Sequence, residues 1–189
     1  MDEEYKSQAR PARIYGNKPV ISMESGRNLG NINDIYIDPE KRKVSGLGIS
    51  RGNFLQKKNE IITADEVVVW GEDVVLLKRT DVIRDPKDVS DFEKWMPLGN
   101  KLKGQSVVTV DGSRVGELDD IFIGPKGEVV GYQITNIKPE YENIEAGYGL
   151  PRNCIPADSI TSMGTDVMIV DLKHVPRKED VSVEEDVDR

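Results

Sequence analysis

The chain has 189 residues, with 26 basic and 34 acidic side chains, a net charge of −8 and a pI near 4.8. An acidic chain without a basic cluster is repelled by nucleic-acid phosphates, so its charge argues against direct binding of DNA or RNA. With Cys154 as its one cysteine and His174 as its one histidine, the chain lacks both an internal disulfide and the usual ligands of a zinc site. The sequence therefore predicts no metal site and no cofactor.

No apolar run approaches the roughly 20 residues that cross a bilayer, and the N-terminus has no apolar signal core. These observations predict no transmembrane segment and a cytoplasmic location. They leave indirect association with a membrane, through a partner, open.

In chain order, residues 1–12 are polar and charged, and we expect them to form a flexible N-terminal arm. The first unit, residues 13–80, contains short stretches in which apolar residues alternate with polar ones, which is the period of a half-buried strand. Asp38 and Pro39 favour a hairpin turn, since proline fixes its backbone angle and aspartate bonds nearby amides. Strands are expected near residues 19–23, 34–38, 44–49, 61–63, 67–70 and 74–77.

Residues 81–97 separate the units and predict a helix that starts at Pro86 and carries a narrow apolar stripe of Val89, Phe92, Trp95 and Met96. The stripe favours a spacer whose aromatic side chains pack on one of the units. The alternative is a docking helix for another protein.

The second unit, residues 98–175, repeats the first. Gly26 to Ile37 (GRNLGNINDIYI) returns as Gly112 to Ile123 (GSRVGELDDIFI), about 86 residues later. The repeat continues through Pro39 and Pro125, then Gly46 and Gly131, and, after an insertion of about eight residues, Ala64-Asp65 and Ala157-Asp158. The acidic tail, residues 176–189, has too few apolar residues to order itself.

The order, spacing and duplication of these elements resemble the PRC-barrel domain. The fold class that follows is all-β, with two tandem small PRC-type β-barrels joined by a short, partly helical linker. Each unit is near the lower size limit for a core of its own, so we expect the two barrels to pack together or to dimerise. The resemblance implies docking of macromolecules, as in the reaction-centre H subunit, a ribosome maturation factor and archaeal cell-division adaptors. It supplies no catalytic residues.

Two sets of side chains could suggest chemistry. Asp119 and Asp120 are adjacent carboxylates, but neighbours on a strand point to opposite faces, so we expect Asp120, like Asp34, to bond backbone amides. Cys154 and His174 could form a nucleophile and base, but no orienting group accompanies them, and Cys154 is expected to be a partly buried apolar residue. We therefore predict no enzymatic activity.

The clearest difference between the units is a long loop, residues 136–153, which carries Tyr141, Tyr148 and Arg152. Long loops on rigid scaffolds often bind partners, and tyrosine is a favoured contact residue. These three residues, with Phe92 and Trp95 of the linker, are the candidate partner-binding residues. The alternative is a loop that covers one end of its own barrel or the seam between the barrels.

The function expected from the sequence is a non-enzymatic cytoplasmic adaptor that docks onto protein partners and takes part in assembling a larger complex, such as the cell-division machinery. A second copy of the chain is also a candidate partner. The alternatives are a ribosome or RNA-processing accessory protein and a regulator that binds a small ligand or metal.

Overall fold

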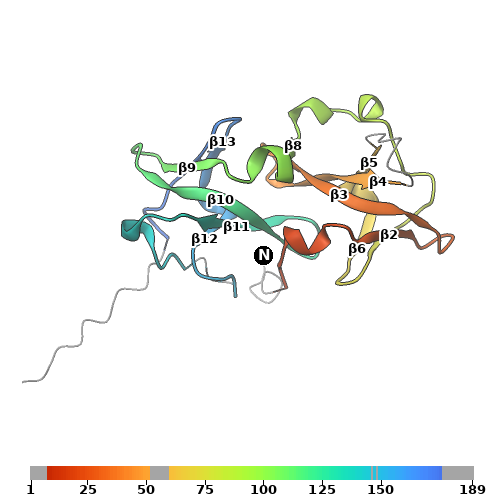
Figure 1. The fold of residues 1–189 in the computed structure, drawn as a ribbon, viewed down its shortest axis with the longest axis horizontal. Coiled ribbons are helices and arrows are strands. Elements are labelled where there is room, and N and C mark those ends of the chain that lie inside the picture. Colours follow the sequence, from red (N-terminus) through yellow and green to blue (C-terminus); the bar gives the residue numbers. More distant parts are fainter. Residues whose placement is uncertain (1–7, 52–59, 146, 148, 176–189) are drawn as a thin grey trace, which may run out of the picture.

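The computed structural model describes residues 8–51, 60–145, 147 and 149–175. Figure 1 shows two β-barrels placed along the long axis, with the first half of the chain on the right and the second half on the left. Barrel 1 consists of β2 (Pro19–Ser22), β3 (Asn28–Asp38), β4 (Lys43–Ser50), β5 (Glu60–Thr63), β6 (Val67–Trp70) and β7 (Val75–Leu77). Barrel 2 consists of β9 (Ser106–Thr109), β10 (Arg114–Ile123), β11 (Val129–Thr135), β12 (Cys154–Pro156), β13 (Ile160–Met163) and β14 (Val167–Val170).

The two barrels have the same strand order. Barrel 1 runs β5-β4-β3-β2-β7-β6 and barrel 2 runs β12-β11-β10-β9-β14-β13. Neighbouring strands are antiparallel except β2 with β7 and β9 with β14, which are parallel. The two end strands of each path are consecutive in the chain and are joined by a 3₁₀ turn, η2 (Ala64–Glu66) in barrel 1 and η7 (Ala157–Ser159) in barrel 2. These corners, rather than a hydrogen-bonded ladder among the described residues, complete each barrel.

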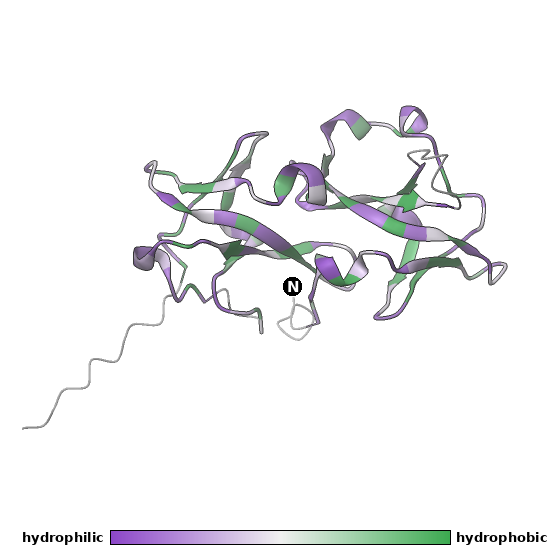
Figure 2. Cartoon of the chain, in the orientation of Figure 1, coloured by the Kyte–Doolittle hydropathy of each residue, from purple (hydrophilic) through white to green (hydrophobic). Residues whose placement is uncertain are grey.

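The long hairpin of each barrel forms where the sequence alternates between apolar and polar side chains, and Figure 2 shows this alternation along β3. Asp38 ends β3 as expected, because its Oδ1 accepts hydrogen bonds from the backbone N–H groups of Glu40 and Lys41, both at 3.0 Å. Although burial raises the pKa of Asp38, these bonds and the Lys41 ammonium at 3.2 Å hold it below its ordinary value. The Asp38 carboxylate is therefore ionised when it fixes the hairpin turn.

Most buried apolar side chains of the two barrels form one continuous hydrophobic cluster, while Phe122 and Cys154 of barrel 2 form a small separate one. Leu47 and Ile49 of β4 and Leu118 and Ile121 of β10 lie fully buried within it. The expectation that the small units pack together is thus confirmed. The shared core also supplies burial that a barrel of this size would lack by itself.

The start of each half adds a short strand to the other half. β1 (Arg10–Pro11) pairs with β10, placing Pro11 opposite Phe122, and β8 (Met96–Pro97) pairs with β3, placing Pro97 opposite the equivalent Tyr36. The expectation of a flexible arm over residues 1–12 is therefore wrong for Arg10–Ala12, since Ala12 is only 2% exposed. Residues 1–7 lie outside the described residues.

A second reciprocal contact lies where the two hairpins meet. Lys43 forms an antiparallel bridge with Glu128, its equivalent in the repeat. On either side, the N–H of Val44 donates to the carbonyl of Gly127 at 3.0 Å, and the N–H of Val129 donates to the carbonyl of Arg42 at 3.4 Å. Equivalent residues face each other in this way only about a two-fold axis, so the chain is built as an intramolecular pseudo-dimer.

The linker does not form the expected helix. It contains two separate 3₁₀ turns, η3 (Pro86–Asp88) and η4 (Phe92–Lys94), and Asp91 between them has a left-handed backbone with φ of 60°. An α-helix cannot continue through such a residue. Because Phe92 stacks near Tyr36 of β3, with ring centroids 5.1 Å apart, the linker aromatics pack on barrel 1 as expected of a spacer.

Candidate functional site

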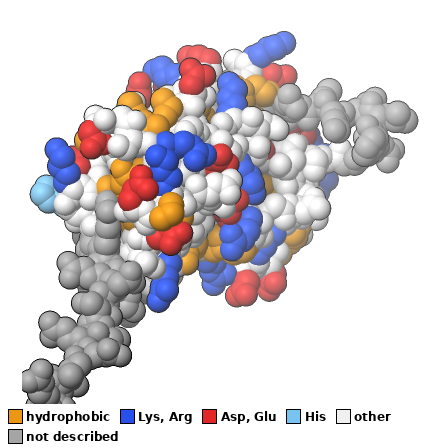
Figure 3. Space-filling view, turned by 60° about the vertical axis from the view of Figure 1, so that its left-hand side comes forward, with side chains coloured by type: hydrophobic (Ala, Val, Ile, Leu, Met, Phe, Trp, Pro, Cys, Tyr) orange, Lys and Arg blue, Asp and Glu red, His pale blue; other side chains and the backbone are white. Residues whose placement is uncertain are grey.

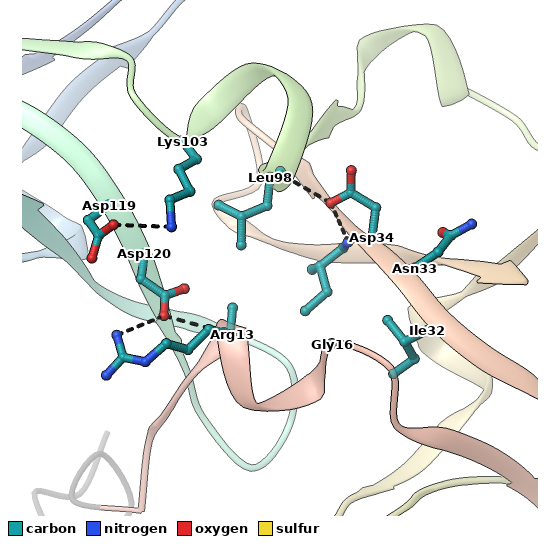
Figure 4. A pocket seen from close by; sticks show the side chains of 12 residues that line it. Arg13, Gly16, Ile32, Asn33, Asp34, Leu98, Lys103, Asp119 and Asp120 are labelled. Carbon is teal, nitrogen blue, oxygen red and sulfur yellow. Dashed lines mark hydrogen bonds and ion pairs between the residues drawn. The ribbon is translucent and has the colours of Figure 1, made fainter.

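Between the barrels lies a small cavity of about 160 Å³, and Figure 4 shows the side chains around it. It is bounded on one side by η1 (Ala12–Tyr15) and β10, and on the other by β3 and the π-helical turn η5 (Leu98–Leu102). Its apolar wall comes from Ala12, Ile32, Ile35 and Leu98, and its charged groups are Arg13, Asp34, Lys103, Asp119 and Asp120. We call this region the seam.

Asp34 and Asp120 make equivalent contacts across the seam. Asp34 Oδ1 accepts from the N–H of Ile35 at 2.8 Å and from the N–H of Gly99 at 3.0 Å. Asp120 Oδ1 accepts from the N–H of Ile121 at 2.9 Å, while its Oδ2 accepts from the N–H of Arg13 at 3.3 Å. Both therefore bond backbone amides, as predicted, and each reaches the segment that begins the other half.

The seam charges are matched within the protein. The Arg13 guanidinium lies 3.3 Å from Asp120, and the Lys103 ammonium lies 3.2 Å from Asp119. Burial raises the pKa of Asp120, and the Asp119 carboxylate raises it further, against the lowering effects of the Ile121 and Arg13 amides and of the Arg13 charge. With its carboxylates already bonded inside the protein, the seam is suited to joining the barrels rather than to chemistry on a ligand.

The linker residues Phe92 and Trp95 are half-buried against barrel 1. Their rings lie 5.7 Å apart between centroids at an interplanar angle of 63°, and a Cβ added to Gly46 of β4 would come within 2.6 Å of the Trp95 ring. Glycine at position 46 thus leaves room for Trp95. The exposed parts of both rings remain available as contact area.

Part of the loop of barrel 2 has the covering role considered above. Ile144 is fully buried and half-buried Tyr141 packs against the core, so this part covers its own barrel. The carbonyl of Ile144 accepts from the N–H of Asn153 at 3.1 Å, which fixes the base of the loop. Arg152 is exposed, and Tyr148 lies outside the described residues. The structure does not bring Tyr141 or Arg152 together with Phe92 and Trp95, which pack on the other barrel.

Cys154 and His174 are not arranged as a nucleophile and base. Cys154 is fully buried in β12, where burial, with a smaller contribution from the Asp120 carboxylate, raises its pKa to about 12 despite a hydrogen bond with the Tyr132 backbone. His174 is exposed near the end of the described chain. A thiol with this pKa stays protonated at neutral pH, so Cys154 acts as a small core residue, more deeply buried than expected.

The sequence did not reveal the seam, nor a second cleft between the linker and barrel 1 that is lined by Lys43 and Arg84. One signal for the second cleft was visible in the sequence. Lys41-Arg42-Lys43 at the hairpin of the first unit corresponds to Lys126-Gly127-Glu128 in the second, so basic charge gathers at one hairpin only.

The fold and the seam define a protein made of two small β-barrels locked together about a pseudo-two-fold axis. The PRC-barrel domain matches residues 15–83 and again residues 98–174, and the chain therefore belongs to the PRC-barrel domain family. A search of curated proteins gave no match. Among the described residues, no three His, Cys, Asp or Glu side chains are grouped as a metal site would need, and no helix has the length and apolarity to span a bilayer.

Proposed function

We propose that this protein is a non-enzymatic adaptor that docks onto protein partners and helps to assemble a larger complex, such as the cell-division machinery, in the cytoplasm. The observation that supports this proposal best is the reciprocal strand exchange of β1 and β8 across the seam. It holds two barrels at a set spacing and orientation. Such a body offers partners two faces at once, which raises the effective concentration of the second contact.

The two faces differ, although the barrels are built alike. Barrel 1 carries the linker with Phe92 and Trp95, whereas barrel 2 carries the loop with Tyr141 and Arg152. A symmetric pair of faces would favour two copies of one partner, while unlike faces favour two different contacts. The face in Figure 3 mixes basic and acidic side chains with small apolar groups, so a contact made there would combine charged and apolar groups.

The proposal is tested by crosslinking in living cells of the native host, followed by identification of the attached proteins. A stoichiometric protein partner is the expected result. Attached ribosomal subunits would instead support an RNA-processing accessory, and turnover of a defined substrate by the purified protein would contradict the non-enzymatic role.

The loop is tested with the double variant Tyr148→Ala/Arg152→Glu, in which Arg152 is an exposed residue. We expect at least about a tenfold loss of partner recovery, since aromatic and arginine side chains dominate interface energies. Lys101→Glu, an exposed charge reversal on η5 in the same half of the chain, is the matched control. Equal recovery with both variants would exclude the loop as the contact while leaving the adaptor role in place.

A further inference from the structure

A cleft of about 390 Å³ lies between the linker and barrel 1, and its size is within the range of small-ligand sites. Its floor is formed by Val44, Ser45 and Val89, which are buried, with Trp95 beside them. The linker wall is fixed by two backbone hydrogen bonds between Ile61 and Arg84, at 2.9 and 2.8 Å. The cleft is therefore bounded by ordered backbone on both sides.

Basic side chains gather at the rim of this cleft, although the chain carries a net charge of −8. Lys41 lies 3.2 Å from Asp38, but Lys43 and Arg84 form no ion pair with any residue that the structure describes. The Arg84 guanidinium donates one long bond, 3.4 Å, to the carbonyl of Asp81 and keeps further N–H groups for another acceptor. Two exposed carboxylates, Asp65 and Asp88, share the rim.

Neutral donors complete the lining. The hydroxyls of Ser45, Thr63 and Ser90 have no hydrogen-bond partner among the described residues. Trp95 also lines the cleft, and its indole N–H, which is buried beneath the surface, has no partner either. A buried donor without an acceptor is unfavourable, so the native state gains from anything that supplies one. Indole, ammonium and guanidinium groups only donate hydrogen bonds, and each hydroxyl can either donate or accept one.

We propose that this cleft binds a phosphoryl group, either as free phosphate or on a phosphorylated side chain of a partner. Its donors come from three segments, namely the start of β4, the corner of β5 with η2, and the linker. A tetrahedral anion can accept from all three directions, and charge-assisted bonds from Lys43 and Arg84 supply the attraction. Because Asp65 and Asp88 offset part of that attraction, affinity for inorganic phosphate is modest, of the order of 1 mM.

The test uses the indole N–H of Trp95 as its own reporter. The chain has two tryptophans, Trp70 and Trp95, and Trp95→Phe assigns their signals in a ¹H–¹⁵N spectrum. Sodium phosphate is titrated into the full-length protein at constant ionic strength, balanced with sodium chloride. We expect a saturable shift of the Trp95 indole signal with no matching shift of Trp70. A shift that fails to saturate, or that chloride reproduces, would overturn the proposal.

Charge variants at the rim are expected to act in opposite directions. Lys43→Gln/Arg84→Gln raises the phosphate Kd about tenfold or more, whereas Asp65→Asn/Asp88→Asn lowers it several-fold. The gain in affinity is a result that misfolding cannot imitate. The control Arg27→Gln/Lys101→Gln removes the same charge elsewhere and should leave the phosphate Kd unchanged. An equal rise of the Kd in this control would mean that phosphate responds only to the net charge of the protein, and would contradict a specific site.

A phosphoserine peptide with glycine and serine on either side distinguishes the two sources, free phosphate and a phosphorylated partner. If it binds at least about tenfold more tightly than inorganic phosphate, the cleft reads a phosphorylated partner, because flanking backbone adds contacts. Equal affinity identifies a site for the free anion. An unphosphorylated peptide that binds equally well would contradict the proposal, since the phosphoryl group would then contribute nothing.

Discussion

Asp34 and Asp120 show how one repeated residue serves two surroundings. Asp34 is half-buried, whereas Asp120 is 3% exposed, and both accept backbone N–H bonds from the opposite half. The sequence predicted these amide bonds from the type of residue and its place on a strand. It could not predict that Gly99 and Arg13 supply them, because no local pattern encodes contacts between segments 65 and 107 residues apart.

At the scale of one residue, Asp34→Ala should lower the free energy of unfolding by about 1–3 kcal/mol, since it leaves the Ile35 and Gly99 N–H groups without their acceptor. Urea unfolding followed by circular dichroism measures the change. The control is Asp119→Ala, which removes a partly exposed ion pair with Lys103 and should cost no more than about 1 kcal/mol. Equal losses of stability in the two variants would argue against a stabilising role for the hydrogen bonds between Asp34 and the backbone amides.

Asp120 should make stability depend on pH. Because burial raises its pKa above 3.8, the folded chain favours the protonated form. Protonated Asp120 therefore contributes to the free energy of unfolding. This contribution is complete below pH 3.8 and is lost as the pH rises through the higher pKa of the folded state. The stability of the native chain relative to Asp120→Asn should therefore fall over that window, as urea unfolding of both proteins from about pH 3 to 7 would measure. A difference that stays constant or grows would contradict this prediction.

At the scale of elements, the strands and hairpin turns were predictable while the linker was not. Apolar alternation and the Asp38 turn are local signals, and they correctly placed β4 and the second half of β3, which begins at Asn28 and not near residue 34. The stripe of Val89, Phe92, Trp95 and Met96 also has helical spacing, but the left-handed backbone at Asp91 interrupts it. The stripe is satisfied by packing on barrel 1, a tertiary contact that overrides the periodicity.

Adding one methyl group at Gly46 should displace the linker from barrel 1. Gly46→Ala places a Cβ about 2.6 Å from the Trp95 ring, which must move. We expect a loss of about 1–3 kcal/mol, the usual cost of overpacking, with a red shift of tryptophan fluorescence as Trp95 becomes exposed. In Gly164→Ala the new Cβ meets its nearest atom at 3.4 Å, so this control should change neither property. An unchanged emission spectrum for Gly46→Ala would mean that Trp95 does not depend on this glycine.

At the scale of the whole molecule, the continuous core predicts that the barrels unfold together. Cys154, fully buried in barrel 2 with a pKa of about 12, reports this opening because thiol reagents reach it only on unfolding. Leu47→Ala in barrel 1 should destabilise the chain by about 2–5 kcal/mol and so speed Cys154 labelling about 30- to 4,000-fold, if opening is rapid relative to labelling.

Labelling with a maleimide, followed by mass spectrometry, measures these rates. Leu118→Ala, a buried substitution in barrel 2 itself, must accelerate labelling whichever way the barrels behave and so calibrates the assay. If Leu47→Ala left the rate unchanged while Leu118→Ala raised it, the barrels would open independently, and the pseudo-dimer would be two separate folding units.

The bridge between Lys43 and Glu128 carries a consequence for how the repeat diverged. In a complex of two identical subunits, a side chain on the symmetry axis must meet its own duplicate, so any charge there confronts a like charge. Covalent fusion removes that restriction and permits a lysine in one half to oppose a glutamate in the other. If the halves were produced as separate polypeptides, each would therefore be electrostatically biased toward its counterpart and away from itself.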